Sequence, residues 1–240
     1  MQNFFGIRID ELTNNQLIQK IADRLITKGN PSIFTNHNLH SLYLCLRDKS
    51  LAAWINSQHV VHADGMGIVY LGKLFGKPLN REHRVTYVDF MPLLLEYAQA
   101  HKYRAFYLGS NQASLNKGLM KIKSLYPSLA IYGCNGYDLS QAIDSIERYK
   151  PDILFVGMGM PRQEKWIIEN INKLNCKVIL PCGAAMDYYS GFAKTPPRWA
   201  GRIGLEWAFR LLYDPLRLWK RYILEPFYIL IRLLLWKFWK

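Results

Sequence analysis

The sequence lacks the short motifs of several common enzyme classes. It contains no GxGxxG, no GxxxxGK(S/T) and no GxSxG. A standard dinucleotide-binding fold, a P-loop NTPase and a hydrolase with a nucleophile elbow are therefore disfavoured. No two aspartates have the spacing Asp-x-Asp, and the six histidines form no HExxH. The metal-holding motif of many sugar-nucleotide transferases is thus missing, and we expect neither a metal nor a cofactor.

Cysteines and long apolar runs are also scarce. The four cysteines show no CxxC spacing, which argues against a zinc site or a redox pair and favours reduced, mostly buried thiols. A spanning helix needs ~20 apolar residues. The apolar segment at the carboxyl end, residues 227–240, is shorter and is interrupted by Arg232 and Lys237. We therefore expect no transmembrane helix.

Acidic residues are in the minority, with 18 Asp and Glu against 31 Lys and Arg and a formal net charge of +13. This balance favours anionic partners. From Lys194 onward ten Lys and Arg face only three acidic residues, and five of the seven tryptophans lie there. The shift predicts a boundary near Pro196–Pro197 between an α/β catalytic domain (residues 1–195) and a basic, tryptophan-rich helical appendage (residues 196–240). Cations among leucines and tryptophans fit lipid better than nucleic acid, so we expect no nucleic-acid partner.

Short β-prone runs alternate with longer amphipathic segments before that boundary. This alternation predicts an α/β fold with a Rossmann-like parallel sheet and helices on both faces. The expected strands are Ile33–Asn36, Val60–Ala63, Ala105–Gly109, Leu129–Gly133, Ile153–Gly157 and Val178–Cys182. The expected helices include Leu39–Ile55, Val88–Ala100, Gln112–Leu125 and Pro161–Leu174.

The most informative stretch is Gly157–Trp166, which follows one of these strands. Its glycines let the backbone turn tightly and approach a ligand, and Pro161 suits the first turn of a helix. Arg162, Gln163 and Glu164 are expected to place polar side chains at the mouth of a crevice at the carboxyl end of the sheet. The alternative is an ordinary loop with a solvated first helical turn.

Asp64 follows the apolar pair Val60–Val61 and precedes a glycine turn, where a carboxylate can act as a general base. The alternative is an aspartate that caps the next helix. Other strand ends carry small or polar residues suited to phosphates or sugar hydroxyls, although several also suit helix capping. These candidate substrate-binding residues are Thr35, Asn36, Asn38, Gly65, Gly109, Ser110, Gly136, Tyr137, Gly157, Gly159 and Asp187.

The tail reads as a series of helices. Residues 204–213 form one short amphipathic segment, and Asp214–Pro215 is a suitable start for a second helix to about Leu224. A third segment follows Glu225–Pro226. Leucines, aromatics and cations together favour a helix that lies in the bilayer interface. A helix packed on the core or on another subunit remains the alternative.

Three separated segments, within a likeness that spans about Phe5 to Tyr222, resemble the WecG/TagA/CpsF family of bacterial glycosyltransferases. They are Ala63–Gly67, Gly157–Trp166, and Pro197–Trp199 together with Gly204–Leu211 and Asp214–Arg217. The resemblance implies a Rossmann-like core whose carboxy-terminal appendage meets the membrane. It also implies inverting, metal-independent transfer from a UDP-sugar to a polyprenyl-diphosphate-linked sugar, for bacterial surface polysaccharide synthesis.

The same resemblance assigns roles to individual residues. Asp64 corresponds to the proposed base, Gln163 to a catalytic residue near the donor, and Arg84 to a substrate-binding arginine before Val-Thr. Arg210, Arg217 and Arg221 correspond to the basic residues that meet the lipid diphosphate. The expected location is peripheral, on the cytoplasmic face of the bacterial inner membrane. The candidate partners are acidic lipids and further copies of the chain in a homo-oligomer.

Two departures from the family pattern affect the expected site. The first strand ends Thr35-Asn36-His37-Asn38, one residue longer than the usual Thr-x-Asn, so either Thr35 or Asn36 fills the threonine position. Tyr87 stands where the family has glycine, which bears on the choice of donor or acceptor. The alternative function is a non-catalytic nucleotide-binding scaffold or sensor at the membrane surface.

Overall fold

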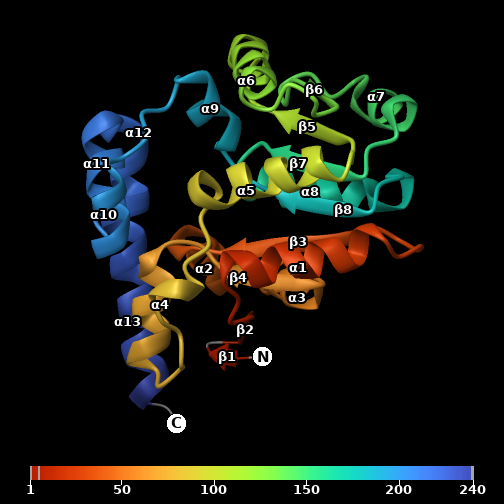
Figure 1. The fold of residues 1–240 in the computed structure, drawn as a ribbon. Helices are drawn as coiled ribbons and strands as arrows, with labels where there is room; N and C mark the ends of the chain where they lie inside the picture. Colours follow the sequence, from red (N-terminus) through yellow and green to blue (C-terminus); the bar gives the residue numbers. More distant parts are fainter. Residues whose placement is uncertain (1, 5, 239–240) are drawn as a thin grey trace. The chain divides into compact units, whose positions relative to one another are not determined.

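The computed structural model describes residues 2–4 and 6–238, so Trp239, one of the tail tryptophans, lies outside the described residues. The chain forms two compact units, each assembled from separated segments. Unit 1 comprises residues 1–12, 36–85 and 196–240, and unit 2 comprises residues 13–35 and 86–195. Figure 1 shows the order of the helices and strands along the chain.

Six strands form one sheet in the order β4-β3-β8-β7-β5-β6. The ladders β3–β8, β8–β7, β7–β5 and β5–β6 are parallel. The expected α/β class with a Rossmann-like parallel sheet is therefore confirmed. The strands are β3 Ser32–His37, β4 Val60–Ala63, β5 Ala105–Gly109, β6 Ile131–Cys134, β7 Ile153–Gly157 and β8 Val178–Pro181.

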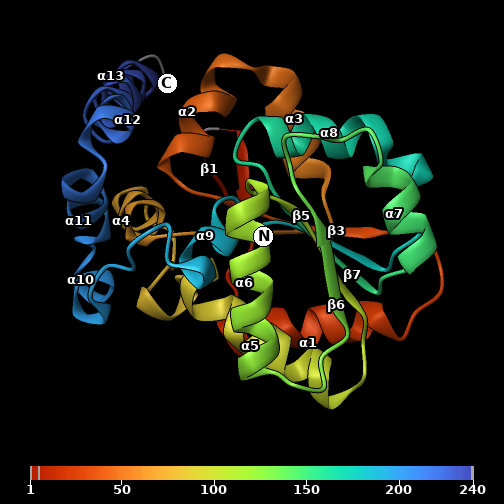
Figure 2. The same ribbon diagram turned by 90° about the horizontal axis from the view of Figure 1, so that it is seen from above.

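Helices cover both faces of the strands in unit 2. Figure 2 shows α1, α5 and α6 on one face and α7 and α8 on the other. Because both faces are covered, every residue of β5 and β7 is buried. The helices of this unit are α1 Asn14–Leu25, α5 Tyr87–Ala100, α6 Gln112–Leu125, α7 Ala142–Tyr149, α8 Arg162–Asn170, the 3-10 turn η2 Ile171–Lys173, and α9 Ala185–Ser190.

Unit 1 combines the amino-terminal hairpin, the segment around β4 and the tail. The hairpin pairs β1 (Gln2–Phe4) with β2 (Ile7–Ile9). The other elements are α2 Leu39–Arg47, α3 Lys49–Ser57, α4 Met66–Leu74, the 3-10 turn η1 Arg81–His83, α10 Arg198–Ile203, α11 Glu206–Tyr213, α12 Pro215–Trp219, the π-helical turn η3 Lys220–Leu224, and α13 Glu225–Phe238.

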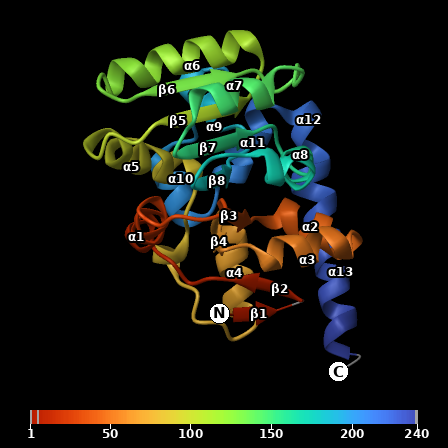
Figure 3. The same cartoon turned by 90° about the vertical axis from the view of Figure 1, so that its right-hand side faces the viewer.

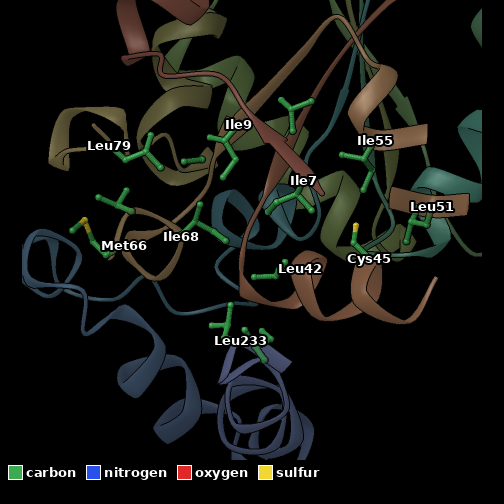
Figure 4. Close-up of a cluster of buried hydrophobic side chains, with 14 residues drawn as sticks. Ile7, Ile9, Leu42, Cys45, Leu51, Ile55, Met66, Ile68, Leu79 and Leu233 are labelled. Carbon is green, nitrogen blue, oxygen red and sulfur yellow. The ribbon is translucent and has the colours of Figure 1, made fainter. Parts of the chain in front are cut away.

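The tail helix α13 belongs to the core of unit 1. It runs beside α2 (Figure 3), and its Ile229 and Leu233 are buried with Ile9, Leu42 and Met66 in one cluster. Figure 4 shows Leu233 within this cluster. Each buried aliphatic side chain stabilises the fold by about 1.5–3 kcal/mol relative to an exposed one. The chain enters this part of unit 1 at Pro196, where the composition shift predicts a boundary. A separate catalytic domain and appendage stay a prediction.

Two helix assignments from the sequence are corrected. The segment expected as one helix over residues 39–55 is two helices, because Asp48 ends α2 and its carboxylate accepts the Leu51 N–H at 3.0 Å as the cap of α3. In the tail, Pro226 does not begin a new segment. Helical backbone continues from α12 through η3 into α13. The π-helical turn changes the hydrogen-bonding pattern just before the proline, which has no N–H to donate.

Candidate active site

Asp64 lies in unit 1, one residue beyond the end of β4. Its N–H donates to the His37 carbonyl at 2.8 Å, and the Asn38 Nδ2 donates to Asp64 Oδ2 at 3.2 Å. Gly65, with φ +84°, occupies the N-cap position of α4, and no side chain caps that helix. Asp64 is therefore not the cap that the alternative interpretation required. Its carboxylate is held by an amide donor beside a turn that needs glycine.

Asp64 and Asn38 line a cavity of about 450 Å³ formed entirely by unit 1. A volume of this size is typical of sites for small molecules. Two cations, Arg210 and Arg221, line the same cavity. The lining also includes Gly65, His40, Met66, Tyr70, Glu206, Trp207 and Tyr222. A carboxylate, two guanidinium groups and several aromatic rings thus share one space, which suits a ligand that carries both an anionic group and a sugar or lipid.

Two polar contacts between described residues connect the tail to the rest of unit 1. Arg84 Nη2 contacts Glu206 Oε1 at 2.5 Å, and His40 Nδ1 contacts Glu225 Oε2 at 2.7 Å. Arg84, expected at the substrate, thus has a carboxylate partner within the protein. Arg217 differs from the other two tail arginines. It pairs with Asp214 at 2.5 Å, is largely exposed, and is not among the described residues that line the cavity.

Two buried histidines lie near Asp64: His62 is two residues before it in the chain, and the His37 carbonyl accepts its N–H. Burial, together with a smaller effect of the neighbouring His62, lowers the pKa of His37 from 6.5 to about 3. Burial also lowers the pKa of His62, to about 4, against the opposing effect of Asp64. The His37 Nδ1 lies 2.7 Å from the Ser41 Oγ. Both rings are therefore neutral at pH 7.

The backbones at several strand ends of unit 2 lie so close together that only glycine fits there. Gly109 pairs in register with Gly157, and a Cβ on Gly109 would lie 2.2 Å from the Gly157 carbonyl oxygen. A Cβ on Gly136 would lie 2.8 Å from the Gly109 Cα. Arg162 Nη2 donates to the Gly136 carbonyl at 2.5 Å and lies over the exposed ring of Tyr137. The structure thus brings together the turns after β5, β6 and β7.

Asp187 is held by hydroxyl groups at the same end of these strands. Ser110 Oγ donates to Asp187 Oδ1 at 3.0 Å, and Ser114 Oγ donates to the same oxygen at 2.6 Å. Ser110 has φ +57°, a left-handed conformation that few residues other than glycine adopt. Such strain is often found at functional sites. The sequence pattern did not identify Ser114, which lies in the first turn of α6.

Gln163 and Glu164 correct the expected polar mouth of the crevice, because both are only 1% exposed. Gln163 Oε1 accepts the Gly159 N–H at 3.2 Å and the Gly183 N–H at 3.0 Å. Its Nε2 donates to Glu164 Oε1 at 2.7 Å. Burial raises the pKa of Glu164 to about 7, against the opposing hydrogen bond from Gln163. Pro161 also differs from expectation, since it is the N-cap of α8 rather than its first helical residue.

The three positions where the sequence was ambiguous are all buried. Thr35 and Asn36 lie within β3, and neither is among the described residues that line the unit 1 cavity. Tyr87 is the first residue of α5, and its ring packs edge-on against Phe90 at 6.2 Å between centroids. The ring found where the family has glycine is therefore part of the packing of unit 2.

Within residues 2–4 and 6–238, no group of three or more His, Cys, Asp or Glu side chains is arranged to hold a metal ion. No helix in the same part of the chain has the length and apolar character needed to cross a bilayer.

The sequence pattern did not identify several residues that line the cavity, chiefly Tyr70, Glu206, Trp207 and Tyr222. Tyr70 lies on α4, and its hydroxyl donates to the Ile203 carbonyl at 3.3 Å. Glu206 and Trp207 open α11. The available signal was the proximity of Glu206 and Trp207 to Arg210 along the sequence, since residues three and four apart share a helix face.

Comparison with known proteins agrees with the family resemblance found in the sequence. The family model described as "Glycosyl transferase WecG/TagA/CpsF family" matches residues 2–240. The chain is 29% identical over 231 residues to the N-acetylglucosaminyldiphosphoundecaprenol N-acetyl-beta-D-mannosaminyltransferase of Staphylococcus aureus strain MRSA252, covering 91% of this chain and 85% of that protein. Proteins of the same name from strains NCTC 8325 / PS 47 and COL are 28% identical with the same coverage.

Proposed function

The chain belongs to the WecG/TagA/CpsF family of glycosyltransferases, and on that premise we propose that it transfers a sugar, with inversion, from a UDP-sugar to a polyprenyl-diphosphate-linked sugar. The observation that carries this proposal is the unit 1 cavity, in which Asp64 shares one space with Arg210 and Arg221. A base and two cations are the groups that a hydroxyl acceptor attached to a diphosphate requires.

In the proposed reaction Asp64 accepts the proton of the acceptor hydroxyl. The hydroxyl oxygen forms a bond to the anomeric carbon of the donor as the bond from that carbon to UDP breaks, and UDP leaves with the electron pair. Asn38, which donates to Asp64 Oδ2, orients the carboxylate. Arg210 and Arg221 bind the acceptor diphosphate, whose oxygens match guanidinium donors.

Unit 2 supplies the proposed nucleotide site, the cradle formed by the turns at Gly109, Ser110, Gly136, Gly159 and Gly183. Glycines let the backbone approach a diphosphate, and the Asp187 carboxylate accepts hydrogen bonds from hydroxyl groups. The Gly159 and Gly183 N–H groups already bind Gln163. Gln163 is therefore assigned to building the cradle rather than to contacting the ligand.

The relatives' names suggest the identity of both sugars. They specify an N-acetylglucosaminyl-diphosphoundecaprenol acceptor and an N-acetyl-β-D-mannosaminyl group. We extend both assignments to this chain as part of the proposal. The product then belongs to the synthesis of a bacterial surface polysaccharide.

The tail is proposed to contact the membrane at its cytoplasmic face. Leu216 is 91% exposed, Leu212 is 76% exposed and Phe227 is 67% exposed. Single exposed apolar residues are ordinary, but a large exposed apolar patch commonly marks an interaction surface. Lys220 and Arg232 add cations that acidic headgroups attract. Helix α13 packs on the protein through Ile229 and Leu233, which are buried in the core of unit 1. Its exposed side also carries apolar side chains, among them Leu230 and Leu234.

The test is UDP release from UDP-N-acetylmannosamine by the full chain, with a synthetic prenyl-diphosphate-linked N-acetylglucosamine as acceptor. We expect release only when both substrates are present, and equal rates with and without EDTA. An acceptor with a monophosphate in place of the diphosphate is the matched control and is expected to react more slowly. Strong inhibition by EDTA would contradict the metal-independent mechanism. Binding of UDP without any turnover would favour the scaffold or sensor instead.

A further inference from the structure

The two polar residues in the first turn of α8 form a buried pair that joins two strand-end turns of unit 2. Gln163 Oε1 accepts both the Gly159 N–H after β7 and the Gly183 N–H after β8. Strands β7 and β8 are neighbours in the sheet. One amide oxygen thus fixes the spacing of two turns, at glycines with φ of +79° and +56°.

The orientation of the Gln163 amide determines whether this link exists. A glutamine amide accepts at its oxygen and donates at its nitrogen. If the amide were turned by 180°, its NH2 group would face two N–H donors and neither hydrogen bond would form. Glu164 opposes that rotation, because its Oε1 accepts from Gln163 Nε2 at 2.7 Å and leaves the amide oxygen directed at the glycines.

Stability alone does not account for a glutamate at position 164. The side chain is 1% exposed, and its Oε2 has no hydrogen-bond partner among the described residues. Burying a carboxyl group with one oxygen unpaired is unfavourable compared with burying an apolar side chain of similar size. An apolar residue would therefore be expected here unless the carboxyl group had another role.

We propose that Glu164 is a positioning residue for nucleotide binding. Its carboxyl group holds the Gln163 amide in the orientation that ties the Gly159 and Gly183 turns together. Glu164 acts through Gln163 and does not itself touch the nucleotide. The inference rests on the proposed function, because it takes the unit 2 cradle to be the UDP site.

The experiment measures the affinity of the full chain for UDP by calorimetry, with thermal unfolding in parallel. Glu164→Leu removes the acceptor and is expected to weaken UDP binding about tenfold, while the thermal midpoint stays the same or rises. Glu164→Gln retains an oxygen that accepts from Gln163 and is expected to bind UDP like the wild type. A residue with only a structural role would not separate affinity from stability in this way.

A double-mutant cycle tests whether Glu164 acts through Gln163. Gln163→Leu alone should weaken UDP binding at least as much as Glu164→Leu, and the double variant should be no weaker than Gln163→Leu. Additive losses would overturn the proposal. So would a Glu164→Leu variant with wild-type affinity, or one whose loss of affinity only follows a loss of stability. If the wild type itself binds no UDP, the proposed nucleotide site is wrong and the positioning role falls with it.

Discussion

In unit 1 the polar side chains of the candidate site face a cavity, whereas in unit 2 they face one another. Asp64, Arg210 and Arg221 all line the same space. In unit 2, by contrast, Gln163 bonds to two peptide groups and to Glu164. Groups that face a cavity are available for chemistry, and groups bonded to each other set a shape. This difference is the basis of our proposal that unit 1 performs the reaction and unit 2 binds the nucleotide.

The units also bury titratable groups of opposite kinds. Unit 1 buries His37 and His62, whose pKa values are lowered by burial, and unit 2 buries Glu164, whose pKa is raised by burial. In each case burial favours the neutral form. As pH falls, the buried histidines therefore lower the stability of unit 1, whereas Glu164 raises the stability of unit 2.

The largest expected effect is a loss of unit 1 stability in acid. Below pH 6.5 the unfolded chain protonates His37 and His62, while the folded chain keeps them neutral to about pH 3 and about pH 4. Stability is therefore lost as pH falls from 6.5 towards 4, by on the order of 5 kcal/mol. Urea unfolding followed by tryptophan fluorescence measures it, since five of the six tryptophans among the described residues belong to unit 1.

His37→Gln is expected to reduce this acid sensitivity. The difference in the free energy of unfolding between this variant and the wild type should therefore shrink as pH falls. If the free energy of unfolding had the same slope against pH in the wild type and in His37→Gln, the buried histidines would not be the cause of the acid sensitivity.

A smaller effect of opposite sign is expected from Glu164. Its folded pKa of about 7 lies above the ordinary 4.5, so the folded chain binds an extra proton between these values. The Glu164 contribution to the free energy of unfolding therefore falls by about 3 kcal/mol in total as pH rises from 4.5 to 7. Above pH 7 it is constant. Glu164→Gln does not titrate, so its stability relative to the wild type should rise over this window in urea unfolding. A constant difference would show that Glu164 is not neutralised by burial.

The three tail arginines should differ in their effect on acceptor binding, because two of them line the cavity and Arg217 does not. Arg210→Gln or Arg221→Gln removes a charged donor from the cavity and should raise the KM for the diphosphate-linked acceptor about 10- to 100-fold, equivalent to about 1.5–3 kcal/mol. Arg217→Gln is the matched control on an exposed site. Steady-state kinetics with a short, water-soluble prenyl acceptor measures the three variants. Equal effects would mean that the cavity does not bind the acceptor.

The smallest expected effect is on membrane binding. Leu216→Ser together with Phe227→Ser should reduce flotation with liposomes that contain acidic lipids by about tenfold, because two exposed apolar side chains no longer enter the interface. Met120→Ser is the control, since Met120 is 73% exposed on α6. A similar loss in the control would mean that binding is not specific to the tail.

The sequence predicted the sheet and the turn at Asp64 well, because both depend on local pattern. The run Ile153–Gly157 is apolar and short, and it is β7 without adjustment. Asn38 and Asp64 were both candidates, since polar residues after strands meet at one edge of a sheet.

What the sequence could not predict depends on residues distant in the chain. Gln163 and Glu164 look like solvated residues of a first helical turn, but the turn at Gly183 binds Gln163 from 20 residues away. Arg217 and Arg221 are four residues apart, a spacing that predicts one shared helix face, yet of the two only Arg221 lines the cavity. Helical periodicity does not say which side of a helix the rest of the protein will cover.

The most direct test of the division between the units is Asp64→Asn, measured for both turnover and UDP affinity in the full chain. The substitution keeps the shape of the side chain and removes the proposed base. We predict a loss of turnover of about 10²–10⁴-fold with UDP affinity unchanged, while Asp48→Asn, at the cap of α3 in the same unit, keeps normal turnover. Near-normal turnover by Asp64→Asn would contradict the account.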